Sequence, residues 1–276
     1  MSTEVEPVRK SSRRLWRGLF GQEVRPAPKD PIHCDVPTLR GAEVAAVYYD
    51  QRRAGDFYEF LRVARSRMLF ALLDMAGRRA DTRDILRAAQ KTFREAATRL
   101  FASEDLNETT AMIELCHAMN RTILLGGIRT CAGFIACYNE ELGTICYANA
   151  GHTPALVRDA TGVTLLGATG LPLGLFSHVP QSASTCALPP QGAMLVISRG
   201  IVEAEYEGEE FGLAGAVASF QSSTGVGAHD VCTALLQAAE SFARIPLIHN
   251  DVTALALVRA EALNPSVPLD TPPCDQ

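Results

Sequence analysis

Apolar residues gather in short runs along most of the chain. Runs of strand length, bounded by turn residues, cover positions 44–49, 58–63, 68–74, 130–138, 144–148, 155–157, 163–166, 182–188, 192–200 and 252–258. Such runs are too short to cross a membrane and predict buried strands. The run 130–138 is apolar almost throughout, which predicts a strand that is covered on both faces.

Three other segments repeat their apolar residues at helical spacing. The repeats are Ile85, Leu86, Ala89, Phe93, Ala97 and Leu100, then Met112, Leu115, Cys116, Met119 and Ile123, then Val231, Leu235, Leu236, Ala239 and Phe242. Asp81 or Thr82 is the expected cap of the first helix, and a break over 103–107 separates the first two. This order of elements predicts an α+β protein with two antiparallel sheets packed face to face and helices outside. The short turns between 44 and 74 predict an antiparallel meander of three strands.

The length suits one large domain or two small ones, and we expect one globular domain with a tail at each end. The chain has 276 residues, of which 47% are hydrophobic and 21% charged, and a net charge of −5 gives no reason to expect nucleic-acid binding. We expect a basic tail over 1–40, a folded domain over 41–260 and a proline-rich tail over 261–276. The first tail places Trp16 among arginines, which is typical of a segment that touches a membrane surface or a partner, or of a disordered tail.

The eight cysteines and the first thirty residues bear on the compartment. No two cysteines form a C-x-x-C pair, and several lie within apolar runs, where a thiol acts as a small hydrophobe. The first thirty residues lack the unbroken apolar core of a secretory signal. We therefore expect a protein of the reducing cytoplasm.

Two aspartates lie next to predicted strands. Asp74 ends the apolar run that starts at Met68, and Asp56 stands at the start of another predicted strand. A carboxylate in such a setting is costly unless it is paired or binds a cation, and two together predict a site for a hard divalent cation. The alternative is that both are ordinary turn or cap residues.

Five segments in this order resemble the SpoIIE-like branch of the metal-dependent (PPM) serine/threonine phosphatases. They are Ala-Gly-Asp-Phe-Tyr-Glu at 54–59, Leu-Asp-Met-Ala-Gly at 73–77, Tyr-Ala-Asn-Ala-Gly-His-Thr-Pro at 147–154, Ile-Ser-Arg-Gly-Ile-Val-Glu-Ala at 197–204 and Asn-Asp-Val-Thr at 250–253. The resemblance covers about 41–260 and implies an αββα sandwich with a Mn or Mg centre at one end of the sheets. There a metal-activated water would attack the phosphorus of a phosphoserine or phosphothreonine.

The resemblance also implies which residues form the site. Asp56, Asp74 and the main-chain carbonyl of Met75 would hold one cation, and Asn250 and Asp251 fall where further metal ligands are expected. Arg78 and Arg79 follow the second motif and are candidates for binding the substrate phosphate, together with Arg199. The candidate catalytic residues are Asp56, Asp74 and Arg199.

Two ligand positions of the second cation depart from the family pattern. Arg199 replaces an aspartate, and Asn250 replaces another. A guanidinium about 4 Å from a divalent ion turns attraction into repulsion, a change of many kcal/mol even at an effective dielectric of about 20. Arg199 would then bind the phosphate itself through its planar fork, or the site would be inactive, or the side chain would point into solvent.

Two functions follow from this pattern. The first is a phosphatase, weak or working with one cation, that acts on a phosphorylated regulatory protein such as an anti-sigma-factor antagonist. The second is an inactive pseudophosphatase that binds a signalling partner. His152 is explained by a role in its turn, and the helices between Asp81 and Ile123 are expected to dock a partner or a second copy of the chain, giving a homodimer.

Overall fold

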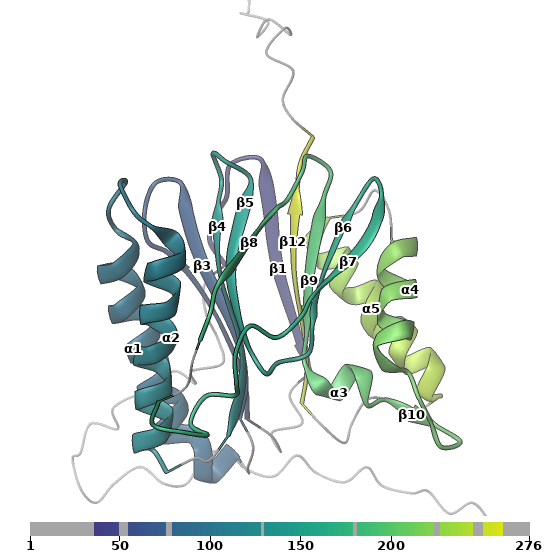
Figure 1. Ribbon diagram of the computed structural model, residues 1–276. Coiled ribbons are helices and arrows are strands. Elements are labelled where there is room, and N and C mark those ends of the chain that lie inside the picture. The colour runs from purple at the N-terminus through teal and green to yellow at the C-terminus, as the bar shows by residue number, and fades with distance from the viewer. Residues whose placement is uncertain are drawn as a thin grey trace, which may run out of the picture. The chain divides into compact units, whose positions relative to one another are not determined.

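Two antiparallel sheets of five strands each form the centre of the described part of the chain (Figure 1). The computed structural model describes residues 36–49, 55–75, 79–127, 130–178, 181–223, 227–244 and 251–261. In spatial order, one sheet holds β2 (Gly55–Arg62), β3 (Arg67–Met75), β4 (Cys131–Asn139), β5 (Thr144–Ala150) and β8 (Ser184–Ala187). The other holds β1 (Ala42–Tyr49), β12 (Val252–Arg259), β9 (Ala193–Ile197), β6 (Ala155–Asp159) and β7 (Gly162–Leu166).

Helices cover the outer face of each sheet, as Figure 1 shows. On the first sheet lie α1 (Arg79–Phe101) and α2 (Glu108–Leu125); on the second lie α4 (Gly212–Ser222) and α5 (Ala228–Ala243). A short helix, α3 (Arg199–Val202), follows β9, and a small ribbon of β10 (Glu205–Tyr206) and β11 (Glu209–Glu210) comes next. The predicted α+β class and αββα sandwich are confirmed.

Three layers of buried side chains hold the sandwich together. Along β3, Leu69, Ala71 and Leu73 pack under α1 and α2, whereas the alternate residues Met68, Phe70 and Leu72 lie between the sheets. This alternation follows from the two-residue period of a strand, and because both faces are covered, both sets are apolar. The strand β4 is covered in the same way, as its apolar run predicted.

The predicted meander over 44–74 is wrong for its first strand. β2 and β3 pair antiparallel, but β1 pairs with β12 along its whole length, so it belongs to the opposite sheet. Short connections favour pairing between neighbours in sequence, yet β1 packs its apolar residues equally well against the last strand of the chain. Because β1 and β12 lie about 200 residues apart, no pattern within either segment of the sequence indicates that they pair.

Helical periodicity also missed part of the structure. α3 and α4 were not predicted; α4 is rich in glycine, alanine and serine, and buries only Ala216 and Phe220, so its apolar stripe is faint. The first helix begins at Arg79, two or three residues before its expected cap, Asp81 or Thr82.

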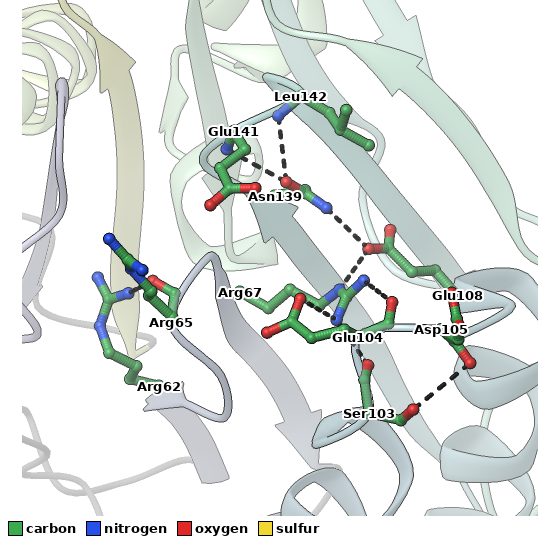
Figure 2. A network of polar contacts seen from close by, with 10 residues as sticks. All are labelled: Arg62, Arg65, Arg67, Ser103, Glu104, Asp105, Glu108, Asn139, Glu141 and Leu142. Carbon is green, nitrogen blue, oxygen red and sulfur yellow. Dashed lines mark hydrogen bonds and ion pairs between the residues drawn. The ribbon is translucent and has the colours of Figure 1, made fainter.

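A buried arginine fastens the loop between α1 and α2 to the first sheet (Figure 2). Arg67 at the start of β3 donates to Glu108 Oε1 at 2.8 Å and to the carbonyls of Ser103 and Glu104 at 2.8 and 3.1 Å. Asn139 at the end of β4 also donates to Glu108 Oε1, at 3.2 Å. Near the middle of α1, Arg94 contacts the buried Glu59 of β2 at 2.8 Å. These bonds satisfy charges that would be costly if unpaired, and they fix the helical layer against the strands that carry Asp56 and Asp74.

The described cysteines are all free thiols, as their apolar surroundings predicted: Cys116, Cys131, Cys137, Cys146, Cys186 and Cys232. Within the described ranges, no helix is both long and apolar enough to span a bilayer. Residues 1–35 and 262–276, which make up nearly all of the two expected tails, lie outside the described residues, so the expectations for them stay predictions.

Candidate functional site

Asp56 and Asp74 lie directly opposite each other on β2 and β3. Side chains of directly opposed residues share one face of the sheet, so the two carboxylates are neighbours. Asp56 is buried, with 3% of its surface exposed, while 13% of the Asp74 side chain is exposed. A Cβ atom at Gly55 would lie only 2.7 Å from the carbonyl oxygen of Met75, so the close approach of the strands requires glycine before Asp56. The sequence prediction that these two aspartates converge is therefore matched by their geometry.

The second sheet supplies the support for Asp56. Thr253 of β12 donates from Oγ1 to Asp56 Oδ2 at 2.9 Å. Ser198, after β9, accepts a hydrogen bond from the Thr253 main-chain N–H through Oγ at 2.9 Å. The site is thus built where the end of β9 and the start of β12 meet the carboxylates of the first sheet.

Asp56 holds its proton much more strongly than an ordinary aspartate. Burial, the neighbouring charge of Asp74 and, less, that of Asp251 raise the pKa of Asp56 from 3.8 to about 8, although hydrogen bonds from Ser198 and Thr253 oppose the shift. Without a cation at the site, Asp56 is therefore mostly neutral at pH 7.

Arg199 lies against Asp74. It is the first residue of α3, and its Nε is 3.4 Å from Asp74 Oδ2 and 3.5 Å from Glu203 Oε1 one helical turn away. The side chain is 59% exposed, so part of the guanidinium is free to meet a ligand. Arg199 therefore contacts Asp74 and at the same time exposes more than half of its side chain to solvent.

Asp251 is buried, and its charge acts on Asp56. Its Oδ2 accepts a hydrogen bond from the Tyr48 hydroxyl at 3.1 Å, and its Oδ1 is buried with no hydrogen-bond partner in the described part of the chain. Asn250, Arg78 and the side chain of Arg79 lie outside the described residues, so their predicted roles stay untested. Sequence reasoning missed Tyr48, because nothing local connects it with a residue 203 positions away.

The loop after β5 is held by Asn149. Its Oδ1 accepts from the His152 main-chain N–H at 2.8 Å, and its Nδ2 donates to the Leu166 carbonyl at 3.3 Å. Gly151 has a positive φ of 69°, and a Cβ there would lie 2.6 Å from the Pro172 ring, so this position requires glycine. The turn is therefore accounted for by Asn149 and Gly151.

The donors at the site fit one hard cation. Asp56, Asp74 and the Met75 carbonyl offer oxygen ligands of the kind that Mg or Mn prefers, and binding a cation would relieve the repulsion that raises the Asp56 pKa. The guanidinium of Arg199 lies against Asp74, where its positive charge would oppose the binding of a divalent cation. Over the described ranges, no three side chains of His, Cys, Asp or Glu are grouped closely enough to hold an ion by themselves.

Solved structures share this fold at low sequence identity. The RsbU and RsbW domains of Rv1364c from Mycobacterium tuberculosis match with a TM-score of 0.66 and 21% identity over 82% of this chain and 62% of that one. The PP2C phosphatase domain with a regulatory fragment of SpoIIE from Bacillus subtilis matches with a TM-score of 0.65 and 14% identity, over 80% and 64%. The catalytic domain of the serine/threonine phosphatase PstP, in complex with 2 manganese ions, matches with a TM-score of 0.56 and 12% identity, over 80% and 99%. The chain thus spans less than two thirds of the first two structures.

Sequence comparison assigns the family. A search of curated proteins gives no match. The family model described as "Stage II sporulation protein E (SpoIIE)" matches residues 65–260, which is more than half of the chain. The match contains Asp74, the Asn149–His152 loop, Arg199 and the Asp251–Thr253 segment. The chain therefore belongs to the SpoIIE family, and it has the fold of the PP2C-type phosphatases.

Proposed function

We propose that this chain binds a regulatory protein through a phosphoserine or phosphothreonine, with Arg199 in the place of a metal cation, and does not turn that phosphate over. The observation that carries the proposal is the contact between Arg199 Nε and Asp74 Oδ2. The guanidinium supplies the positive charge that the phosphate needs, and it is partly exposed. The sequence alone favoured a phosphatase; the position of Arg199 moves the balance towards a pseudophosphatase.

Charge balance supports this proposal. Asp56 is mostly protonated near neutral pH, and Asp74 has Arg199 as its counter-ion, so neither carboxylate needs a cation to balance its charge. A guanidinium can bind two phosphate oxygens at once through parallel hydrogen bonds, which a lysine cannot do. An exposed arginine beside a paired aspartate can therefore exchange part of its contact with Asp74 for a phosphate.

The second candidate is a phosphatase that works with one Mn or Mg ion. It is favoured by the opposed pair of Asp56 and Asp74 and by the adjacent Met75 carbonyl. Such an ion would supply a water of lowered pKa and charge for the phosphate. In this candidate Arg199 would orient the phosphate, and Asp56 and Asp74 would hold the ion.

The nature of the partner also belongs to the proposal. SpoIIE, whose phosphatase domain shares the fold, is described as a cell fate determinant with a regulatory domain. A phosphorylated regulator, such as an anti-sigma-factor antagonist, is therefore the partner that we propose. Cytoplasmic location, the absence of nucleic-acid binding, membrane contact through the basic tail and a homodimer stay predictions.

The proposal is tested by titrating the protein with phosphoserine and with serine, without added divalent cation, and following binding by NMR. Phosphoserine is expected to bind and serine not. Arg199→Gln should weaken binding about tenfold or more, because a hydrogen bond between charged groups contributes about 1.5–3 kcal/mol. Arg121→Gln, an exposed arginine on α2, is the matched control and should leave binding unchanged. Equal binding by the wild type and Arg199→Gln would contradict the proposal.

Hydrolysis separates the two candidates. Wild-type protein is assayed with p-nitrophenyl phosphate over a range of manganese concentrations. The pseudophosphatase predicts no turnover above the buffer rate. Manganese-dependent turnover that Asp74→Asn abolishes would establish the one-cation phosphatase instead.

A further inference from the structure

Arg199 lies between two carboxylates that belong to different elements. Its Nε is 3.4 Å from Asp74 Oδ2 on β3 and 3.5 Å from Oε1 of Glu203, the residue that directly follows α3. Nε carries a single hydrogen, and both distances exceed the roughly 2.7–3.2 Å of a formed N–H···O hydrogen bond. The two carboxylates therefore compete for one donor, and neither holds it completely.

The guanidinium has solvent around it in which to change its position. The side chains of Arg199 and Glu203 are 59% and 41% exposed, whereas that of Asp74 is only 13% exposed. Exposed side chains change rotamer within picoseconds to nanoseconds, so the barrier between neighbouring positions is low. We therefore expect two arrangements of Arg199, one with its Nε–H bonded to Asp74 and one with it bonded to Glu203.

Helix stability does not account for the contact between Arg199 and Glu203. α3 covers only Arg199–Val202, a single turn. An acidic residue stabilises a helix best when it precedes the basic one, because that order suits the helix dipole, and here the arginine comes first. The main chain of Glu203 is already held by its N–H, which donates to the Arg199 carbonyl at 3.0 Å. The contact between the two side chains thus acts on the position of the guanidinium.

The two arrangements differ in the charge that lies next to Asp74. When the guanidinium is bonded to Asp74, its positive charge opposes a divalent cation, and when it is bonded to Glu203, Asp74 and the opposed Asp56 are open to one. A ligand that binds only one of two arrangements has an apparent dissociation constant equal to the intrinsic one divided by the fraction of molecules in that arrangement. Glu203 raises this fraction and so strengthens the binding of a cation.

We propose that Glu203 is a positioning residue that draws Arg199 away from Asp74 and thereby sets the affinity of the aspartate pair for a divalent cation. Cation binding and the contact of Arg199 with Asp74 then exclude each other. The inference deepens the proposed function by naming a group that regulates the same site, and it rests on that function only in the contact between Arg199 and Asp74.

The first test follows the Arg199 Nε–H group by NMR without added divalent cation. The protein is labelled with ¹⁵N-arginine, and the Arg199 signal is assigned with Arg199→Lys. The wild-type signal is expected between that of Glu203→Gln, in which the guanidinium stays on Asp74, and that of Asp74→Asn, in which it moves to Glu203. Glu209→Gln removes an exposed charge from the neighbouring β10–β11 ribbon and should leave the signal unchanged. A wild-type signal that coincides with that of Glu203→Gln or of Asp74→Asn would overturn the inference.

The second test measures manganese affinity by calorimetry in a double-mutant cycle. Glu203→Gln should raise the dissociation constant about threefold or more, which is the size of an exposed ion pair, and Glu203→Asp should restore part of the affinity because it keeps the carboxylate. In the background of Arg199→Met, Glu203→Gln should change the constant by less than about 1.5-fold, since the remaining effect of an exposed charge is screened by salt. Equal effects in both backgrounds would contradict the inference, as would a wild type that binds no manganese.

The outcomes distinguish this inference from the proposed function. If phosphoserine binds and depends on Arg199 while Glu203→Gln changes neither the Arg199 signal nor the manganese affinity, only the role of Glu203 fails. If the Arg199 signal is shared between the two carboxylates while phosphoserine does not bind, the proposed phosphoprotein binding fails and the role of Glu203 remains.

Discussion

The two sheets contribute to the site in opposite ways. The β2–β3 hairpin provides the carboxylates of Asp56 and Asp74 at opposed positions, as a cation site needs. The end of β9 provides Arg199, and the residue before Asp251 is an asparagine. The first sheet therefore contributes negative charge to the site, and the segment after β9 contributes positive charge. The comparison shows that the sandwich brings two carboxylates of one sheet against a guanidinium that follows a strand of the other.

The largest expected effect comes from placing carboxylates at positions 199 and 250, so that both sheets contribute negative charge to the site. In the double variant Arg199→Asp with Asn250→Asp, a cation is exchanged for an anion beside Asp74 and a further carboxylate is added. Manganese affinity, measured by calorimetry, should rise at least about a hundredfold, since removing one unfavourable charge contact at close range contributes several kcal/mol. Arg121→Asp changes an exposed charge on the outer helical layer and should leave the affinity within about twofold. A double variant that binds manganese no better than the wild type would remove the charge argument.

The next effect concerns pH and the carboxylates of the first sheet. The pKa of Asp56 is about 8 in the folded protein and 3.8 in the unfolded chain, so between these values the folded state binds an extra proton. Stability from this group is present at low pH and is lost as the pH rises from about 4 to 8.

Asp56→Asn should therefore flatten the pH dependence of unfolding. The free energy of unfolding of the wild type should fall between pH 5 and pH 8.5, and that of Asp56→Asn should not. The difference between the two proteins should therefore change by more than about 1 kcal/mol in favour of the variant, because one pKa unit corresponds to about 1.4 kcal/mol. Urea unfolding without divalent cations measures this. A pH dependence equal to that of the wild type would mean that Asp56 is ionised throughout.

The smallest effect tests how the second sheet supports the first. Thr253→Val removes the hydrogen bond that lowers the pKa of Asp56, so this pKa should rise by about one unit, the size of a net hydrogen bond of roughly 1 kcal/mol. The ¹³C carboxyl signal of Asp56, followed over pH, gives the value. Thr233→Val on α5, whose hydroxyl bonds only within its own helix, is the control. An unchanged pKa would show that the two sheets act independently.

Local patterns predicted the carboxylates of the first sheet well. Asp56 and Asp74 belong to strands that follow each other in the chain, and a short turn between strands forces them to pair, so two carboxylates near strand ends were expected to meet. The same reasoning placed β1 in the wrong sheet, because a strand carries no mark of its partner when that partner lies 200 residues away. It explained His152 by its turn, where the residue bonds Asn149 through its main-chain N–H and the Thr153 carbonyl through its ring.

The sequence by itself determined the strands and main helices, the two carboxylates and the replacement of aspartate by Arg199, because hydrophobic period and residue identity are local properties. Only the tertiary structure decided that Arg199 lies on Asp74, that Thr253 of the second sheet bonds Asp56 of the first, and that Tyr48 bonds Asp251. Those contacts depend on how two sheets pack, and packing is fixed by the sum of many weak apolar contacts that no single segment records.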